Sequence, residues 1–575
     1  MTAWRRIAVA LVTAGAIGAL GVALAPGVTA QDRLTGRSFA TRSETIARNA
    51  MVATSHPFAT QIALDVLKAG GNAIDAAIAA NAFLGLGDPG NSGIGGDLYA
   101  VVWDAKTRRL YGLNASGRSA RAMTLAELKR RGLTQIPATG PLGISVPGCV
   151  DGWFELHARF GSTPMAQLLA PTIAYAREGF PVAPDISDDS TLRLSQRLPA
   201  TPPGSFANLR ALYMPGGHFP KKGDIFRNPG LANSLEQIAK GGRDAFYKGP
   251  IAAAIAAHIK AQGGFLSVED FAAHTSDWVQ PVSTTYRGYQ VWELPPNTQG
   301  SAVLEMLNIL EGVDLASAGF GSADHVHWFT EAKKLAFEDL AAAYADPTTM
   351  KVPVERLLSK EYGAQRRALV KADRAGVYDS GFPVDSHTVY LTTADKAGNM
   401  VSLIQSNSLS FGSLEVVEGL GFALHNRGMW FELKEGHPNS YAPGKRPFHT
   451  IIPAFVTRDD EPYISFGLMG GDMQPQGHVQ ILMNLIDFGM NLQEAGDAPR
   501  IYHAGSFPRA GHVADVGELN LESGFAPETI RELMRRGHKV TNAYGMYGGY
   551  QAIMRKGGVY YGASESRKDG YAAGY

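Results

Sequence analysis

The stretch DSHTVYLTTADKAGN, residues 385 to 399, decides how the rest of the chain is interpreted. Its first half alternates as a β-strand does, and the residues DKAGN that follow are typical of a turn. In such a strand, positions 388, 390 and 392 share one face, while positions 389, 391 and 393 share the other. Thr388 carries a hydroxyl next to Val389, and the question is whether this hydroxyl is a nucleophile that cuts its own chain.

The composition is that of a large globular protein with balanced charge. The chain has 575 residues, 53 Lys and Arg against 53 Asp and Glu, 45% hydrophobic residues and 66 glycines. A chain of this length can bury a large core. Its zero net charge removes the usual electrostatic argument for a nucleic-acid partner, and we predict none. Strand and helix patterns occur in both halves, so we expect one composite domain of strands and helices.

The first 30 residues have the layout of a secretory signal. Arg5 and Arg6 precede an apolar run from Ile7 to Leu24, and the small residues VTA end at Ala30. This order predicts cleavage after Ala30 and a periplasmic or secreted protein; the alternative is an uncleaved anchor. No later stretch is long and apolar enough to span a bilayer, so we expect no membrane association after the signal peptide, residues 1–30, is removed.

Local patterns predict several elements. Residues 56–86 indicate two helices broken at Gly70 and Gly71, with Asn72 or Asp75 near the start of the second. Residues 97–117 alternate around a polar turn, which predicts a hairpin. A long amphipathic helix is expected from Asp324, as its N-cap, to a stop at Pro347.

Cysteine and histidine give little indication of a thiol or metal site. Cys149 is the only cysteine, so no intrachain disulfide can form, and we expect a small buried thiol. His325 and His327 form an HxH pair in the predicted long helix, where residues two apart point to different faces. We therefore favour a structural role over metal binding. We predict no metal and no cofactor.

Two glycine clusters could bind an anion. GNSGIGGDLY at 90–99 and GLMGGDMQPQGH at 467–478 each place consecutive glycines after an apolar run. Consecutive glycines let the backbone approach a ligand and direct N–H groups at an oxyanion. Neither cluster has the spacing of a dinucleotide fingerprint or of a phosphate-binding P-loop.

The order of these and other motifs closely resembles the gamma-glutamyltransferase family from about residue 50 to the C-terminus. The motifs are, in order, GGNAIDAA, NSGIGGDLY, SVPGCVDGW, LLAPTIAYAREGFPV, FLSVEDFAAH, LPPNTQG, DKAGNMVSLIQSNSLSFGS, PGKRPFHTIIPAF, MGGDMQPQGH and GASESRKDGYAAG. The resemblance implies an α+β fold, the four-layer αββα sandwich of N-terminal-nucleophile hydrolases. It also implies an exported precursor that cuts itself.

The resemblance divides the chain into a large-subunit region, residues 31–387, and a small-subunit region, residues 388–575. The two fragments would stay associated within one composite domain. The new N-terminal threonine, Thr388, would be the nucleophile and its free α-amine the base, since such an amine titrates near neutral pH. The glycine pair that matches the family's oxyanion hole is Gly470 and Gly471.

The chain departs from the family at the nucleophile. An ungapped count back from DKAGN puts the family's nucleophilic threonine on Val389, which has no heteroatom and cannot attack a carbonyl. A one-residue shift along a strand changes the face. Thr388 serves only if the strand start is rearranged, for example by cleavage after His387. An active Thr388 and a single uncut chain both remain open.

The predicted substrate pocket departs as well. The family's carboxylate-binding arginine falls on Ser116, and Arg118, two positions later, is the candidate clamp or else a surface ion pair. The acid that holds an α-amine falls on Trp430, which could offer a cation–π contact. The paired serines fall on His449 and Thr450, whose polar side chains could still bond a substrate. These changes resemble the cephalosporin-acylase-like and oxamate-amidohydrolase-like branches more than glutathione transpeptidases.

The sequence therefore predicts a self-cleaving amide hydrolase or acyltransferase. Its substrate would be a small amide or peptide of the γ-glutamyl (glutathione-like) type or a related acyl amide, and its reaction would pass through an acyl-enzyme. The alternative is an uncleaved, impaired homologue that binds such amides without turnover. An unrelated serine or metal hydrolase is disfavoured because no compact motif for either stands out.

Overall fold

The computed structural model describes residues 38–202, 204–378, 387–505, 515–542 and 547–575. The predicted signal peptide, residues 1–30, lies outside the described residues. Residues Thr41–Tyr575 form one compact unit, and the fold is described for that unit. None of the helices in the described ranges combines the length and apolarity needed to cross a bilayer.

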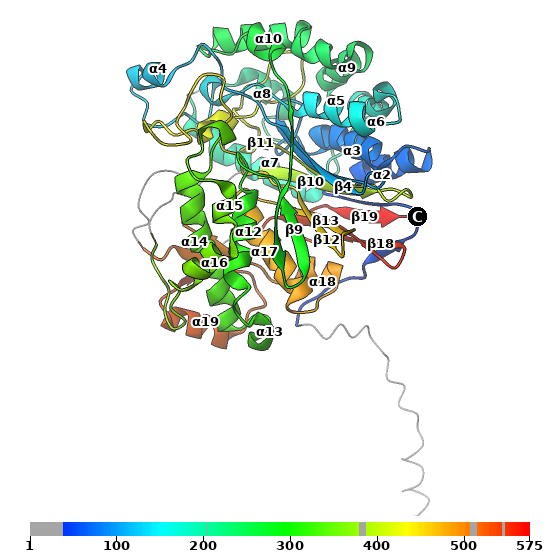
Figure 1. Ribbon diagram of the computed structural model, residues 1–575. Coiled ribbons are helices and arrows are strands. Elements are labelled where there is room, and N and C mark those ends of the chain that lie inside the picture. The colour runs from blue at the N-terminus through cyan, green and yellow to red at the C-terminus, as the bar shows by residue number, and fades with distance from the viewer. Residues whose placement is uncertain (1–37, 203, 379–386, 506–514, 543–546) are drawn as a thin grey trace, which may run out of the picture. The chain divides into compact units, whose positions relative to one another are not determined.

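Two seven-stranded antiparallel sheets form the centre of the unit (Figure 1). The first sheet has the order β1 (Thr45–Ala47), β18 (Val559–Ser564), β17 (Gly549–Lys556), β13 (Glu461–Met469), β12 (Ala454–Arg458), β9 (Tyr289–Glu293), β8 (Val282–Tyr286). The second has the order β19 (Tyr571–Gly574), β2 (Met51–Thr54), β10 (His387–Ala394), β11 (Met400–Ser408), β3 (Asp97–Asp104), β4 (Arg109–Ala115), β7 (Asp277–Val279). The predicted α+β class is confirmed.

The hydrophobic core fills the space between the two sheets. Apolar side chains from both sheets meet there, including Tyr99, Trp103, Tyr390, Phe455 and Ile553. Strand alternation in β10 divides its residues between this core and the helices outside. The pattern explains why a continuous run of β10 is buried on both faces.

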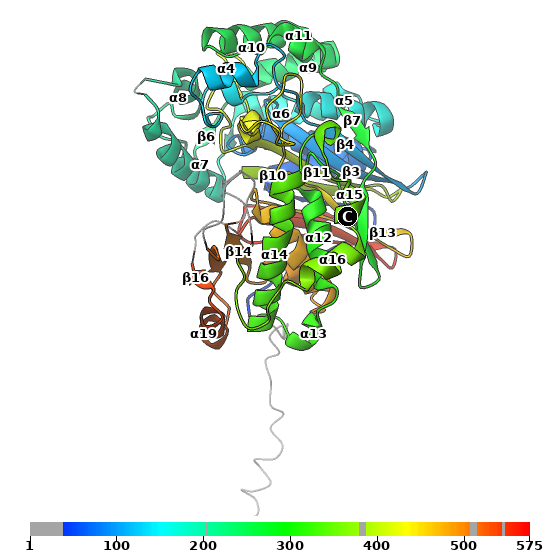
Figure 2. The same cartoon turned by 60° about the vertical axis from the view of Figure 1, so that its left-hand side comes forward.

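Helices cover the outer face of each sheet (Figures 1 and 2). Against the second sheet lie α2 (Pro57–Lys68), α3 (Ala73–Gly87) and α5 (Cys149–Phe160), with α6 (Met165–Glu178) packed on α3. Against the first lie α12 (Gly300–Leu310), α17 (Met473–Ile486) and α18 (Leu492–Asp497), with α14 (Ala323–Ala343) and α16 (Lys360–Arg367) packed on α12.

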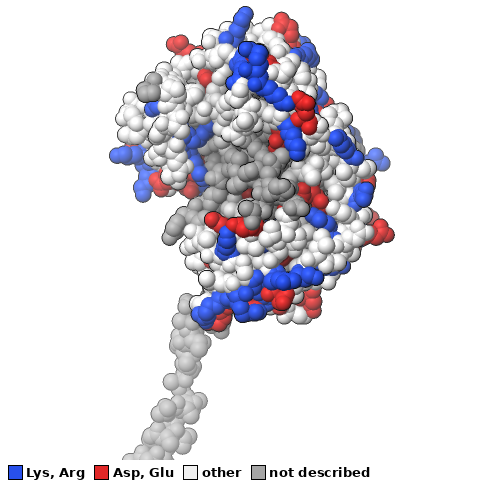
Figure 3. Space-filling model, turned by 90° about the vertical axis from the view of Figure 1, so that its left-hand side faces the viewer, with Lys and Arg blue, Asp and Glu red and all other residues white. Residues whose placement is uncertain are grey.

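The remaining elements surround these layers. The helices are α4 (Leu125–Arg130), α7 (Pro184–Arg197), α8 (Ala207–Tyr213), α9 (Pro229–Tyr247), α10 (Pro250–Ala261), α11 (Val268–Ala272), α13 (Leu315–Ala318), α15 (Val354–Leu357) and α19 (Pro527–Arg535). Short strands form two small sheets: β5 (Phe180–Pro181) with β6 (Ile225–Phe226), and β14 (Ile501–Ala504), β15 (Glu518–Leu521) and β16 (Lys539–Thr541). On the face in Figure 3, basic and acidic side chains are interspersed.

Most local predictions are confirmed. Helix α2 ends before Gly70, and Asn72 caps α3 in a reciprocal capping box with Asp75. The predicted hairpin is β3 and β4. The prediction that Asp324 caps the long helix is wrong: the Ser322 side chain accepts from the third helical N–H, which puts Asp324 in the first turn. Cys149 is buried, and burial raises the pKa of its thiol.

Candidate active site

The start of β10 lies over the end of β13, across the interface of the two sheets. The Thr392 and Ser465 hydroxyls are 2.7 Å apart. Two residues earlier in β10, the Tyr390 ring lies against Gly467, where a Cβ would come within 2.4 Å of the ring. Moving back along β10 therefore moves forward along β13. Positions 392 and 390 of β10 thus face the other sheet, and we call this set of positions the inter-sheet series. The next position of the series toward the start of β10 is 388, and β13 ends at Met469.

Val389 belongs to the opposite face of β10. It is 1% exposed, and the same face carries Thr393, whose hydroxyl donates to the Ala73 carbonyl of α3 at 2.7 Å. The backbone register places Thr388 between the pairs His387–Ser408 and Val389–Gln405, where the pairing shifts by one residue. By alternation, position 388 belongs to the inter-sheet series and position 389 to the helix-facing series.

The predicted glycine pair directly follows β13. Gly470 and Gly471 have φ of +118° and +62°, which favour glycine, and a Cβ on Gly470 would stand 3.1 Å from the Gly548 Cα. The pair leads into α17, whose first turn donates from Met473 N to the Gly470 carbonyl at 3.0 Å. The backbone N–H groups at a helix start have no intrahelical partner and suit an anion. The oxyanion role of this pair stays a prediction that its position supports.

Gln299 joins this glycine turn to the predicted substrate residues. Its buried side-chain amide donates to the Gly471 carbonyl at 2.7 Å and also to the Thr450 carbonyl. One side chain thus fixes both backbone segments. The arrangement brings Thr450, and His449 before it, next to the glycine pair.

Trp430 lies at the other end of the same region. Its Nε1 donates to the Ser408 hydroxyl at 3.0 Å, and Ser408 pairs with His387 at the start of β10. Trp430 is 1% exposed and packs against the Phe448 ring, one residue before His449. The indole is thus held by the protein at the strand start.

The guanidinium of Arg427 places a buried positive charge in this site. Its Nη1 donates to Thr450 Oγ1 at 2.9 Å. Within the described part of the chain, its Nε and Nη2 have no hydrogen-bond partner. Burial lowers the pKa of Arg427 to about 10, against the attraction of Asp97, so the group remains a cation at neutral pH. A buried cation with two unused donors is suited to an anionic group of a ligand.

Asp97 and His449 flank this cation. Asp97 Oδ1 accepts from the Gly117 and Gly148 N–H groups at 3.1 and 3.2 Å, and its Oδ2 lies 3.3 Å from His449 Nε2. Burial and repulsion by Arg427 hold the pKa of His449 well below its usual value, so the ring is neutral. Asp97 therefore balances the charge of Arg427.

Arg118 lies apart from this group. Its Nη2 pairs with Asp277 at 3.3 Å, and Asp277 also pairs with Arg446. These three residues line a cavity of about 470 Å³ whose lining includes none of Trp430, His449, Thr450 or the glycine pair. Of the predicted site residues, the structure brings together Trp430, His449, Thr450, Gly470 and Gly471 at the start of β10, and it engages Arg118 elsewhere.

Sequence reasoning did not select three residues of this site. Arg427 lies in the stretch HNRG just before Trp430, Gln299 lies in NTQG, and Asp97 follows the glycines of GIGGD. All three are fully buried. The available signal for Gln299 and Asp97 was their place within motifs of the family resemblance, whereas Arg427 lies between two such motifs. Burial of a charged side chain depends on distant segments, which the sequence around it does not show.

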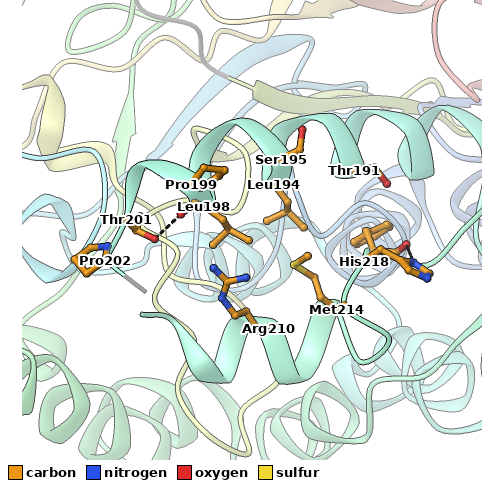
Figure 4. Close-up of a pocket in the computed structure, with 12 residues that line it drawn as sticks. Thr191, Leu194, Ser195, Leu198, Pro199, Thr201, Pro202, Arg210, Met214 and His218 are labelled. Carbon is orange, nitrogen blue, oxygen red and sulfur yellow. Dashed lines mark hydrogen bonds between the residues drawn. The ribbon is translucent and has the colours of Figure 1, made fainter. Parts of the chain in front are cut away.

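A second cavity, more apolar, opens between α7 and α8 (Figure 4). Its volume is about 470 Å³, and Leu194, Leu198, Met214 and Phe219 line it together with Arg210. Helix α7 is tied to the loop after β11, because the Arg197 guanidinium donates to the Ser410 carbonyl. All of the lining residues come from positions 191–219, which lie outside the segments that carry the glycine pair and Arg427.

The chain is similar to several known proteins. Residues 59–575 match the family model described as gamma-glutamyltranspeptidase. A "Glutathione hydrolase-like YwrD proenzyme" of Bacillus subtilis is 36% identical over 91% of this chain and 98% of its own. An "Oxamate amidohydrolase proenzyme" of Klebsiella pneumoniae is 33% identical over 93% and 100%. The crystal structure of a cephalosporin acylase from Bacillus halodurans superposes with a TM-score of 0.87 at 41% identity, over 96% of this chain and 99% of that one.

The chain belongs to the gamma-glutamyltranspeptidase family. The predicted family is thus confirmed, as is its placement toward the acylase-like and oxamate-amidohydrolase-like members. Two of these relatives are named as proenzymes, and all three are named for hydrolytic or acylase activity.

Proposed function

We propose that this protein is a self-cleaving amide hydrolase whose nucleophile is the Thr388 hydroxyl. The observation that carries the proposal is the register of β10. The inter-sheet series Thr392, Tyr390 leads back to position 388, opposite the end of β13 and the Gly470–Gly471 turn. The proposal includes the four-layer αββα architecture of N-terminal-nucleophile hydrolases, in which the helices outside the two sheets form the first and fourth layers.

The proposed chemistry uses the strand start as a new chain end. Hydrolysis of the His387–Thr388 peptide bond frees the Thr388 α-amine, whose pKa near 8 suits a general base. The amine takes the hydroxyl proton while the oxygen attacks the substrate carbonyl, and the Gly470–Gly471 turn stabilises the oxyanion. The amine then protonates the leaving amine, which leaves an ester on Thr388. Water, or an acceptor amine, attacks this ester to release the acyl group.

The proposed substrate class is an amide whose acyl group carries a carboxylate, such as γ-glutamyl or a related small diacid. Arg427 supports this choice because its unused Nε and Nη2 groups can donate to both oxygens of a carboxylate in a bidentate fork. The neighbouring His449 is neutral and adds no second positive charge. The Trp430 position carries no acid to neutralise an α-ammonium, so the proposal does not require an amino group on the acyl chain.

The proposal also includes export of the precursor. The charged start, apolar run and VTA ending of residues 1–30 support a signal peptide and a periplasmic or secreted enzyme. The proposed small subunit, residues 388–575, stays bound to the large one, because each sheet contains hydrogen-bonded strands of both regions.

The test is the intact mass of the purified protein under denaturing conditions. Two fragments, the second beginning at Thr388, support the proposal. Thr388→Ala should stay a single chain, whereas Thr392→Ala, which removes a hydroxyl from the same face of the same strand, should still be cut. A single wild-type species after prolonged incubation would reject the mechanism and favour the alternative, an uncleaved homologue that binds amides without turnover.

A further inference from the structure

A second cluster of chemically active side chains lies on the helices outside the first sheet. His327, Glu331 and His538 each offer one ligand atom, and these atoms all lie within 4.8 Å of one another. His327 and Glu331 are one turn apart on α14, and His538 lies between α19 and β16. Helices α14 and α19 pack side by side (Figure 2). All three side chains are buried or nearly so.

We propose that His327, Glu331 and His538 bind one Zn²⁺ ion. Two imidazole nitrogens and one carboxylate oxygen are a common protein ligand set for zinc, with the fourth position taken by water. This site uses His327 of the HxH pair but not His325. His325 accepts from the Gly321 N–H through its Nδ1 and packs between Phe320 and Phe488.

A hydrogen bond of His327 fixes the tautomer that a metal ligand needs. Its Nε2 lies 2.8 Å from the Lys371 carbonyl, which can only accept, so Nε2 carries the hydrogen. Its Nδ1 then carries the lone pair. Zinc-bound histidines typically donate their other ring N–H to a carbonyl or carboxylate in this way.

The two histidine nitrogens are slightly closer together than two ligands of one zinc ion would be. His327 Nδ1 lies 2.9 Å from His538 Nε2, whereas ligand atoms about 2.0–2.1 Å from a tetrahedral zinc are about 3.3 Å apart. The rings need to separate by only a few tenths of an ångström. The hydrogen now shared between them moves to the other nitrogen of His538, so both rings ligate as neutral imidazoles.

Glu331 has competing partners. Its Oε1 accepts from Lys334 at 2.6 Å, and its Oε2 accepts from Gly376 N at 2.8 Å and the Tyr378 hydroxyl at 2.9 Å. The Lys334 ammonium offsets the charge that attracts a cation, which weakens binding. It also makes a sharp test possible: removing this ammonium should tighten zinc binding.

Titration calorimetry with ZnCl₂ on the metal-stripped, untagged full chain tests the proposal. Wild type should bind one Zn²⁺ per chain. His327→Gln and His538→Gln should each weaken binding about 100-fold or more, and Lys334→Gln should tighten it about tenfold. His218→Gln, at an exposed histidine, is the matched control. Circular dichroism verifies folding of each variant.

Cobalt provides a second readout if a histidine variant unfolds. Co²⁺ added to the wild-type protein should give the visible absorption of a tetrahedral site, and Zn²⁺ should abolish it. The absence of stoichiometric binding in folded wild type, or affinity unchanged in both folded histidine variants, overturns the proposal. None of these readouts depends on chain cleavage or amide hydrolysis, so the zinc site and the proposed function can fail separately.

Discussion

Arg427→Met should change substrate preference more than stability. Methionine keeps much of the length of the side chain but removes the fork that we propose for a substrate carboxylate. Two donors, Nε and Nη2, are without a partner in the described structure. A hydrogen bond to a charged group contributes about 1.5–3 kcal/mol, so a bidentate contact is worth about 3–6 kcal/mol. This corresponds to a loss of about 10²–10⁴-fold in kcat/KM for an anionic acyl group.

The effect on folding should be much smaller. The substitution loses the Arg427–Thr450 hydrogen bond, worth about 1 kcal/mol. It also removes a fully buried cation, which is costly to desolvate. These two contributions oppose each other, and thermal unfolding should show a shift of only a few degrees.

The assay compares two amides that differ only in the acyl terminus, one carboxylate and one carboxamide, on wild type, Arg427→Met and Arg427→Lys. We expect the anionic substrate to lose 10²-fold or more with methionine and less with lysine, which keeps the charge but lacks the fork. The neutral substrate should change by less than about threefold. Equal losses for both substrates would mean that Arg427 only supports the fold, and no loss for the anionic one would reject the assignment.

Four other substitutions test residues of the site and of the surrounding fold. Gly470→Ala should abolish turnover and destabilise the protein by about 1–3 kcal/mol because of its φ of +118°. The control is Gly489→Ala, at a φ of +59° with open space around it, which should cost about 1 kcal/mol of stability and leave turnover unchanged. Enzyme kinetics and urea unfolding distinguish the two variants. Gln299→Leu should lower kcat and cost about 2–4 kcal/mol, since two buried carbonyls each lose a donor. Burial lowers the pKa of His478 to about 3, so this ring stays neutral in the fold but is protonated in the unfolded chain below pH 6.5. Burial also raises the pKa of Glu293, whose carboxyl lies 2.7 Å from His478 Nδ1, so the two shifts offset each other between pH 6.5 and 4.5. Stability should therefore fall by up to about 1.4 kcal/mol per pH unit only below about pH 4.5, and this loss should be smaller in His478→Gln, as urea unfolding at several pH values would reveal. Asn72→Ala should cost about 1 kcal/mol in unfolding experiments through loss of the α3 cap, with no change in turnover.

Local features of the fold were predictable because their causes are local. The Asn72 cap, the break at Gly70 and the β3–β4 hairpin each follow from a few neighbouring residues. The Asp324 prediction failed because the serine two positions earlier can make the same hydrogen bond and starts the helix sooner. Cap positions are decided by one turn of backbone, which sequence spacing alone does not fix.

The site was only partly predictable because its charges are placed by distant segments. An arginine in a polar stretch such as HNRG is ordinarily a surface residue, but Arg427 is buried against Thr450 and close to Asp97. His327 and His538 are 211 residues apart and meet only because α14 packs on α19. The family motifs predicted which segments would converge. The counter-ions and hydrogen-bond partners of the site could be identified only from the folded structure.

The order of strands in the sheets has a consequence for refolding. Each sheet contains strands from both sides of the His387–Thr388 bond: β2 lies between β19 and β10, and β18 pairs with β1. A chain cut at that bond could not come apart into two folded pieces, since each piece would lose hydrogen-bonded neighbours in both sheets. An uncut precursor refolds in a first-order reaction, whereas the two cut chains must first meet. After denaturation, the yield of cut protein should fall on dilution while that of the precursor stays constant.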